Sequence, residues 1–415
     1  MIVELVSVGT EILLGDIVNT NSNYLAKKCA ELGITNYYQV TVGDNEKRLA
    51  DVIKTSLSRC DILVLSGGLG PTTDDLTKEI TAKALGRELI QDLSVKKSII
   101  DYFKDPNLRD IPDNNWKQSY IIEGSIVVKN NNGTAPGLIV ETDDKKIIIL
   151  LPGPPRELIP MFEETIVPYL RKYLPGTYYS RMVKISGVGE SKAATTVADL
   201  IDKQTNPTIA PYAKLGEVNF RITASANDKA EAKKLIEPVV NEFKNRFANK
   251  IFTTNEEETL EDVVVNLLLK NGLKLSTAES CTGGLLSGKI INVSGASKVF
   301  EEGFITYSNK AKEKYLKVKK ESLDKYGAVS SQVAKEMVLG TAKKTGSQAC
   351  IAITGLAGPE GGSKEKPVGL VYIAVFLNNN VEVKEYRFNG NRQSIRERTV
   401  VMALDLLRLS IINTL

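Results

Sequence analysis

Short apolar segments alternate with amphipathic segments in the first part of the chain, and this alternation constrains the fold more than any other feature. Residues 2–8, 38–42 and 61–66 are largely apolar, whereas residues 21–32 and 47–57 repeat their apolar positions with the period of a helix. Near-continuous apolar strands between such helices are typical of a parallel sheet that is covered on both faces. The sequence therefore predicts an α/β fold.

Gly- and Pro-rich loops follow two of the predicted strands. Residues 67–71 (GGLGP) come directly after strand 61–66, and residues 151–155 (LPGPP) come after the apolar strand 146–150. Ligands of parallel sheets bind at the loops beyond the carboxyl ends of the strands. We therefore expect a ligand site at this edge of the N-terminal sheet.

The chain is long enough for more than one hydrophobic core, and its pattern divides into three parts. We predict an N-terminal parallel-sheet domain over residues 1–174, a small α+β domain over 178–254 and a C-terminal α/β domain over 256–415. The middle domain lacks a Gly-rich loop of its own, so a spacer or dimerisation role is the simplest interpretation. Its predicted elements are strands 182–187 and 218–224 and helices 190–201 and 228–247. The C-terminal domain is predicted to contain a helix at 256–270 and strands at 273–277, 350–354 and 368–376.

The complete absence of histidine limits the chemistry of the chain. A Ser-His-Asp or Cys-His catalytic unit and a His-ligated metal are both excluded. The four cysteines (Cys29, Cys60, Cys281 and Cys350) are far apart, which argues against a structural zinc or a redox dithiol. Any metal is therefore expected to be a hard cation such as magnesium, and any general base must be Asp, Glu, Lys or Tyr.

Charge and N-terminal sequence indicate a cytoplasmic protein and argue against nucleic-acid binding. The formal net charge is only +4, and lysines and acids are interspersed even in the dense run at residues 310–320, which is typical of a solvated helix face. With a single Trp there is little for base stacking, so nucleic-acid binding is not expected. Residues 1–7 lack the basic start of a signal peptide, no uncharged stretch has membrane-spanning length, and dispersed cysteines fit a reducing compartment.

Four loops of the N-terminal domain are rich in glycine, at residues 9–16, 66–75, 132–137 and 152–157, and all but 132–137 also carry carboxylates. Backbone N–H groups in such loops converge on anions, and a helix start adds favourable partial charge. Helix capping by Thr72 and Asp74 explains the second loop equally well when that loop is taken alone. The loop is neither a Walker A motif nor a G-x-G-x-x-G fingerprint. The candidate phosphate-binding residues are Gly67, Gly68, Gly70, Thr72, Gly133, Thr134 and Gly153.

Ser280 is placed between a predicted strand and a Gly-rich helix start. A serine at this position is most simply a helix cap, although its hydroxyl could also enter a pocket that contains free backbone donors. The N–H groups of residues 281–284 are candidate donors to an oxyanion. Cys281 is a competing nucleophile, but a small buried cysteine beside a site is the simpler interpretation.

The N-terminal motifs resemble those of the CinA family. The resemblance rests on GTEILLG at residues 9–15, SGGLGPTTDDLT at 66–77 and GTAPG at 133–137, and it continues into the middle region with GVGES at 187–191 and NPTIAPY at 206–212. It implies a molybdopterin-binding-like domain with a divalent-metal-dependent ADP-ribose pyrophosphatase activity. By residue type and loop position, the carboxylates expected to bind metal or activate water are Asp74, Asp75, Glu79 and Glu157. Leu158 stands where the family commonly has Met, which is a mild departure.

The C-terminal motifs resemble the PncC-like amidohydrolase domain of the same family. They are TAESCTGG at residues 277–284, GFITYSNKAK at 303–312, GAVS at 327–330 and TGLAGPEGG at 354–362. The resemblance implies deamidation of nicotinamide mononucleotide without a cofactor, with Ser280 as nucleophile and with Tyr307 and Lys312 completing the catalytic unit. A desolvated lysine with a lowered pKa suits the role of base in a chain without histidine.

The same resemblance supplies the remaining expectations for the C-terminal domain. The expected substrate-binding residues are Thr282, Gly283, Gly284, Thr354, Gly355, Gly358, Arg392 and Arg396, with the two arginines as candidates for the ligand phosphate. The family pattern usually reads Gly-Asp-Arg before the first arginine, whereas this chain has Gly390-Asn391-Arg392. A homodimer is also implied by the resemblance.

Three alternatives to a bifunctional enzyme remain open at this stage. Only one of the two domains could be catalytically active. The N-terminal domain could bind a pterin or a nucleotide without turning it over. A partner role in competence or recombination is the third alternative, and the sequence chemistry gives it little support.

Overall fold

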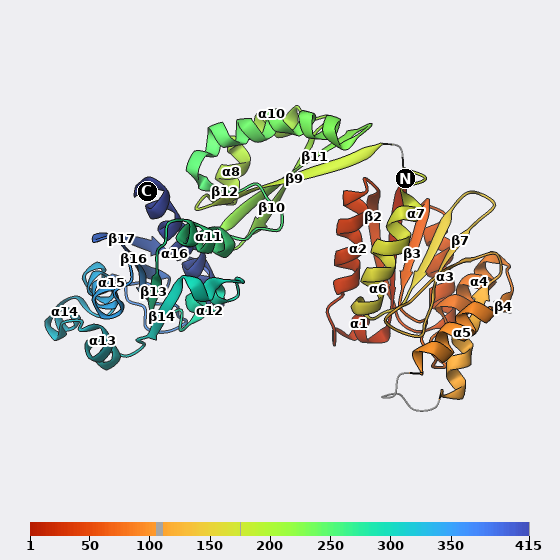
Figure 1. Ribbon diagram of the computed structural model, residues 1–415, viewed down its shortest axis with the longest axis horizontal. Coiled ribbons are helices and arrows are strands. Elements are labelled where there is room, and N and C mark those ends of the chain that lie inside the picture. The colour runs from red at the N-terminus through yellow and green to blue at the C-terminus, as the bar shows by residue number, and fades with distance from the viewer. Residues whose placement is uncertain (105–110, 175, 415) are drawn as a thin grey trace. The chain divides into compact units, whose positions relative to one another are not determined.

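The computed structural model describes residues 1–104, 111–174 and 176–414, and the chain forms two compact units (Figure 1). One unit comprises Met1–Tyr179 and Ser225–Ala232, and the other comprises Ser180–Ala224 and Lys233–Leu415. Both units combine helices with sheets, and the sheets at the two ends of the chain contain parallel strands. The predicted α/β class is therefore confirmed.

A six-stranded sheet with the order β2-β1-β3-β8-β7-β6 forms the centre of the first unit. Its strands are β1 (Ile2–Val8), β2 (Thr35–Val42), β3 (Ile62–Ser66), β6 (Ile126–Val128), β7 (Gly137–Glu141) and β8 (Ile147–Leu151). β2, β1, β3 and β8 are mutually parallel as predicted, whereas β7 pairs antiparallel with both β8 and β6. The difference arises because the loop at residues 142–146 is too short for the crossover that a parallel connection needs.

Helices cover both faces of this sheet. On one face α2 (Thr20–Glu31), α6 (Pro155–Met161), the π-helix η2 (Phe162–Ile166) and α7 (Val167–Leu170) bury Leu25, Leu158 and Phe162. On the other face α3 (Glu46–Leu57), α4 (Thr77–Leu85) and α5 (Leu93–Tyr102) bury Leu49, Ile53 and Ile80. The remaining elements are α1 (Thr10–Leu14), the 3-10 helix η1 (Asp113–Ser119) and the hairpin of β4 (Leu89–Gln91) and β5 (Tyr120–Ile122).

The middle segment forms a four-stranded sheet with the order β10-β11-β9-β12. Its elements are β9 (Thr177–Ser186), α8 (Glu190–Thr196), α9 (Ala198–Asp202), β10 (Thr208–Lys214), β11 (Glu217–Ala226), α10 (Lys229–Phe247), η3 (Ala248–Lys250) and β12 (Ile251–Thr253). The predicted single helix at 190–201 is two helices, because Val197 leaves the helical conformation with φ −121° and ψ 16°. Phe220, Phe243 and Phe247 pack together in its core.

The C-terminal sheet has the order β14-β13-β15-β16-β17. Its strands are β13 (Leu275–Glu279), β14 (Phe300–Ile305), β15 (Ala349–Gly355), β16 (Leu370–Leu377) and β17 (Asn380–Arg387). β14, β13 and β15 are mutually parallel, whereas β16 and β17 are antiparallel. The carboxyl ends of the three parallel strands consequently meet at one edge.

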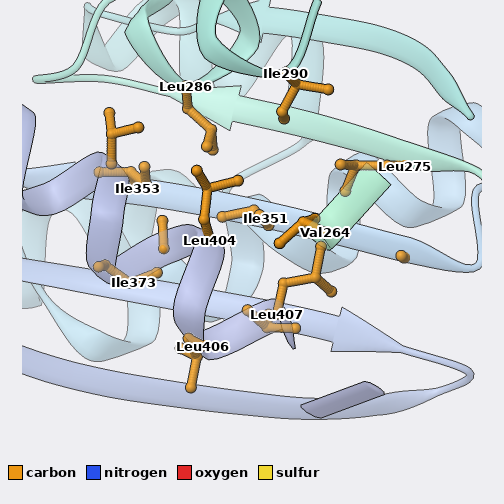
Figure 2. Packing of buried hydrophobic residues seen from close by; sticks show 14 of the residues in the cluster. Val264, Leu275, Leu286, Ile290, Ile351, Ile353, Ile373, Leu404, Leu406 and Leu407 are labelled. Atoms are coloured by element: carbon orange, nitrogen blue, oxygen red, sulfur yellow. The ribbon is translucent and has the colours of Figure 1, made fainter. Parts of the chain in front are cut away.

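One face of this sheet is covered by α11 (Leu260–Lys270), α12 (Leu285–Ile291) and α16 (Arg392–Thr414), and Figure 2 shows their side chains packed against the strands. The other face is covered by α13 (Asn309–Leu316), α14 (Lys320–Tyr326) and α15 (Ser331–Thr345). The short 3-10 helix η4 (Ala296–Lys298) precedes β14. α11 begins later than predicted because Thr259 and Asp262 form a capping box. Across the described residues, no helix combines the length and apolar character needed to cross a membrane.

Candidate functional site

The parallel strands of the C-terminal sheet bring three predicted site residues to one edge. Ser280 directly follows β13, and Tyr307 lies two residues beyond β14. Thr354 is the penultimate residue of β15. The Ser280 N–H donates to the carbonyl of Ile353 at 3.1 Å, which fixes the start of the serine loop to the neighbouring strand. This is the edge at which parallel sheets bind ligands.

Ser280 and Lys312 form a direct contact at this edge. Lys312 Nζ donates to Ser280 Oγ at 3.1 Å and to the backbone carbonyls of Thr306 at 2.8 Å and Tyr307 at 3.4 Å. Lys312 comes from the first turns of α13, which begins at the cap residue Ser308. The serine has a basic nitrogen within hydrogen-bond reach, as an activated nucleophile requires.

The Lys312 side chain is desolvated although it belongs to a lysine-rich segment. It is only 1% exposed, and no carboxylate bonds to its nitrogen among the described residues. Burial disfavours the ammonium form and lowers the pKa of Lys312 to about 8. The neutral amine is therefore accessible near physiological pH.

The Tyr307 phenol lies apart from the Ser280–Lys312 pair. Tyr307 is 62% exposed, and its hydroxyl accepts a hydrogen bond from Arg392 Nη2 at 3.4 Å. The backbone carbonyl of Tyr307, not the phenol, contacts Lys312. Within the described residues, no hydrogen bond joins the phenol to Ser280 or Lys312. The structure thus brings together two of the three residues predicted for the catalytic unit.

The Glu279 carboxylate binds backbone N–H groups at the end of the loop that follows Ser280. Its carboxylate is fully buried and accepts from the N–H groups of Gly284 at 3.0 Å, Leu286 at 3.1 Å and Ser287 at 2.8 Å, and from Ser287 Oγ at 2.6 Å. Gly284 has φ +96°, a conformation that favours glycine. Sequence reasoning assigned no role to Glu279, although it is part of the TAESCTGG motif.

The Glu279 carboxylate reduces the number of candidate oxyanion donors in the loop. The N–H of Gly284 is taken by Glu279, and the N–H of Gly283 donates to the carbonyl of Ser280 at 3.2 Å. The N–H groups of Cys281 and Thr282 donate to no oxygen among the described residues. The Thr282 hydroxyl is buried there without a hydrogen-bond partner.

The two predicted phosphate-binding arginines have different environments. Arg392 is exposed and donates through Nη1 to the carbonyl of Gly358 at 2.7 Å. Arg396 is half-buried and donates to the carbonyls of Cys281 at 2.9 Å and Thr282 at 2.8 Å. Asn391 Oδ1 accepts from the N–H of Ser394 at 2.9 Å, so it caps α16 as an aspartate would.

The other predicted substrate-binding residues lie at the same edge of the C-terminal sheet. Thr354 Oγ1 donates to the carbonyl of Ala328 at 2.7 Å, which ties β15 to the loop before α15. Gly355 packs closely against Val371 of β16. Cys281 is buried, which raises the pKa of its thiol to about 11 and keeps it protonated at neutral pH.

A separate cavity of about 630 Å³ lies at the strand ends of the N-terminal sheet. Six of the seven predicted phosphate-binding residues line it, namely Gly67, Gly68, Gly70, Gly133, Thr134 and Gly153. Thr72 is not among the lining residues; its N–H donates to Asp75 Oδ2 at 3.0 Å, so it stabilises the turn. Gly67 has φ +102°, and a Cβ there would lie 2.1 Å from the carbonyl oxygen of Val8. The loop can therefore approach β1 only with glycine at this position.

The predicted metal-binding carboxylates are only partly brought together. Asp74, Asp75 and Glu157 line the cavity, but Glu79 does not; its Oε1 is 3.7 Å from Lys117 Nζ. Glu157 is buried and accepts from Asn130 Nδ2 at 2.8 Å. Among the described residues, no three Asp, Glu or Cys side chains lie close enough to hold a metal ion. Magnesium is usually held by one or two carboxylates together with substrate phosphates, so Asp74, Asp75 and Glu157 stay the predicted metal-binding carboxylates of this cavity.

Sequence reasoning assigned no individual role to several polar residues of this cavity. Asn19, Asn21, Glu11 and Asp44 also line it. Asn21 Nδ2 donates to the carbonyl of Gly153 at 2.6 Å, whereas its Oδ1 is buried without a partner in the described part of the chain. The available sequence signal for Glu11 and Asp44 was their position just after the apolar strands β1 and β2.

Comparison with known proteins covers both sites. Residues 257–411 match the CinA C-terminal domain, residues 4–172 the probable molybdopterin binding domain and residues 180–253 the damage-inducible protein CinA KH domain. A relative from Clostridium beijerinckii is 52% identical over 405 residues, which is 98% of each protein. The chain belongs to the CinA family.

A second relative matches over almost the full length of both proteins, whereas a solved structure matches only part of this chain. A CinA-like protein from Dictyoglomus turgidum is 51% identical over 410 residues, which is 99% of each protein. Among solved structures, the competence/damage inducible protein CihA from Agrobacterium tumefaciens is 43% identical, over 37% of this chain and 93% of that one, with a TM-score of 0.36. The expected membership of the CinA family is confirmed.

Proposed function

We propose that the C-terminal domain of this CinA protein is an amidohydrolase that converts nicotinamide mononucleotide to nicotinate mononucleotide and ammonia. The observation that carries the proposal is the 3.1 Å contact between Ser280 Oγ and the desolvated Nζ of Lys312. A serine next to a neutral amine is a nucleophile with its own base. The nicotinamide substrate is the expectation that the family motifs imply.

The proposed first step forms an acyl-enzyme. Neutral Lys312 takes the proton of Ser280, and the oxygen attacks the carboxamide carbon. The N–H groups of Cys281 and Thr282, which donate to no oxygen among the described residues, are the candidates to stabilise the oxyanion. The C–N bond breaks when the nitrogen receives the proton from Lys312, and ammonia leaves.

The second step returns the enzyme to its starting state. Water attacks the ester on Ser280 while Lys312 accepts its proton, and the carboxylic acid is released as the serine regains a proton. All atoms of amide and water are then found in acid and ammonia. No cofactor is needed for this sequence.

The test measures ammonia release from nicotinamide mononucleotide by the purified chain. Ser280→Ala is expected to lower the rate by about 10³-fold or more, because it removes the nucleophile. Cys281→Ala is the matched control and is expected to retain most of the activity, since the thiol is protonated at neutral pH. Undiminished release by Ser280→Ala, or loss only in Cys281→Ala, would reject the assignment.

We also propose that the N-terminal cavity binds and splits a nucleotide diphosphate of the ADP-ribose type. Its volume of about 630 Å³ lies in the range of small-molecule sites, and its backbone-rich Gly loops suit phosphate oxygens. The buried Oδ1 of Asn21 has no hydrogen-bond partner in the described part of the chain, which supports a ligand that carries a hydrogen-bond donor. The metal requirement remains a prediction, because the carboxylates do not form a metal site by themselves.

This second proposal is tested by AMP release from ADP-ribose, with and without added magnesium. Gly67→Val is expected to abolish AMP release while ammonia release by the other domain continues, because the new side chain meets the Val8 carbonyl. Loss of both activities would indicate general unfolding, and thermal unfolding of the variant distinguishes that case. Unchanged AMP release would contradict the proposal. A ligand that binds without being split would favour the binding-protein alternative.

A further inference from the structure

Residues 280–284, the nucleophile loop, are held at two places by two charged side chains. Glu279 binds N–H groups at the end of the loop and the start of α12, as described above. Arg396 of α16 binds two carbonyls in the middle of the loop, through Nε to Cys281 at 2.9 Å and through Nη2 to Thr282 at 2.8 Å. Gly283 and Gly284, both with positive φ, offer no side chain to fix the loop internally.

The Arg396 contacts determine where a backbone donor points. A peptide unit is planar and trans, so the N–H of Thr282 points opposite to the carbonyl of Cys281. Binding that carbonyl to Arg396 therefore directs the Thr282 N–H away from the arginine. This N–H is one of the two in the loop that donate to no oxygen among the described residues.

The environment of Arg392 differs from that of Arg396. It is exposed at the start of the same helix, with one contact to the Gly358 carbonyl and a longer one to the Tyr307 hydroxyl. Its guanidinium is available to a ligand at the strand-end edge. The Nε and Nη2 atoms of Arg396, in contrast, already donate hydrogen bonds to the nucleophile loop.

We infer that Arg396 is a positioning residue that aims the Thr282 N–H at the oxyanion, and that Arg392 alone of the two arginines binds the substrate phosphate. The inference rests on the proposed amidohydrolase reaction. It reassigns Arg396 from ligand binding to the support of catalysis. Its consequence is a different kinetic signature for each arginine.

The experiment compares nicotinamide mononucleotide with nicotinamide riboside, which has the same amide but no phosphate. Arg396→Lys retains the charge but loses the fork that spans two carbonyls, so kcat is expected to fall about tenfold or more for both substrates, with KM little changed. Arg392→Ala is expected to raise KM about tenfold or more for the mononucleotide only. A rise in KM confined to the mononucleotide in Arg396→Lys would overturn the inference.

A second readout separates this inference from the proposed reaction. A fluorophosphonate probe reacts with an activated serine whatever the natural substrate, and its adduct also places an oxygen at the oxyanion position. Slower labelling of Ser280 in Arg396→Lys, with thermal unfolding unchanged, is expected even if the wild-type chain releases no ammonia. Equal labelling rates would overturn the positioning role. A wild-type chain that neither releases ammonia nor reacts with the probe would reject both proposals.

Discussion

The Nζ atom of Lys312 lies 3.1 Å from the Oγ atom of Ser280, across 32 positions of the chain. The contact forms because Ser280 follows β13 and Lys312 follows the adjacent parallel strand β14, so both reach the same sheet edge. Burial of the lysine then changes its acid–base behaviour.

Lys312→Arg is expected to lower amide hydrolysis by about 100-fold or more, because a guanidinium stays protonated and cannot accept the serine proton. The measurement is the steady-state rate of ammonia release. Lys310→Arg, on the same segment but exposed, serves as the matched control. Near-normal activity of Lys312→Arg would show that a positive charge, and not a base, is what the site needs.

The rate of hydrolysis is expected to rise with pH. Lys312 acts as a base only when neutral, and its lowered pKa is about 8. The kcat/KM should therefore increase about tenfold per pH unit well below 8 and level off above it. A pH profile of kcat/KM between pH 6 and 10 checks this. A profile that falls over that range would require a protonated Lys312.

Tyr307→Phe is expected to lower kcat by less than about tenfold, because the variant keeps the backbone carbonyl that contacts Lys312 and loses only a phenol whose partner is Arg392. Any effect should appear chiefly in KM for the mononucleotide. Steady-state kinetics of the variant with the mononucleotide measure kcat and KM separately. A loss of about 100-fold in kcat would instead support a phenol in the proton path, as the family motif implies.

Arg408→Met is expected to destabilise the C-terminal unit by about 3–5 kcal/mol, because it leaves the carboxylate of Asp405 buried without its partner. Arg408 and Asp405 are each 1% exposed, and Arg408 Nη2 donates to Asp405 Oδ1 at 2.6 Å and to the carbonyl of Asn249 at 2.7 Å. Denaturant unfolding measures the change. Arg387→Met, which breaks an exposed pair with Glu385, is the control and should cost no more than about 1 kcal/mol.

Much of the fold was predictable because it depends on local periodicity. Apolar runs located β1, β3 and β8 within one or two residues, and the Gly-rich loops after them line the N-terminal cavity. The antiparallel strands β7 and β6 were not predicted, since strand direction depends on loop length and pairing partners. The break at Val197 was likewise invisible to a pattern of apolar positions.

Most residues of the candidate active site could be predicted from the sequence, but their individual roles could not. The family motifs implied a catalytic unit of Ser280, Tyr307 and Lys312, and the structure brings Ser280 and Lys312 together. Residue type alone could not separate Arg392 from Arg396, because the contact from Arg396 to the Cys281 carbonyl spans 115 positions. Glu279 was overlooked because a carboxylate in a motif does not reveal which N–H groups it accepts from.

The amino-acid sequence by itself determined which functional groups exist. A chain without histidine must rely on an amine, a phenol or a carboxylate for base catalysis, and its strand-loop pattern places serine and glycine loops at sheet edges. Only the tertiary structure decided that Lys312 is desolvated while its neighbours in a lysine-rich segment are solvated. The physical reason is that pKa and hydrogen-bond partners depend on the dielectric surroundings and on contacts between residues distant in the chain, and neither is encoded in local periodicity.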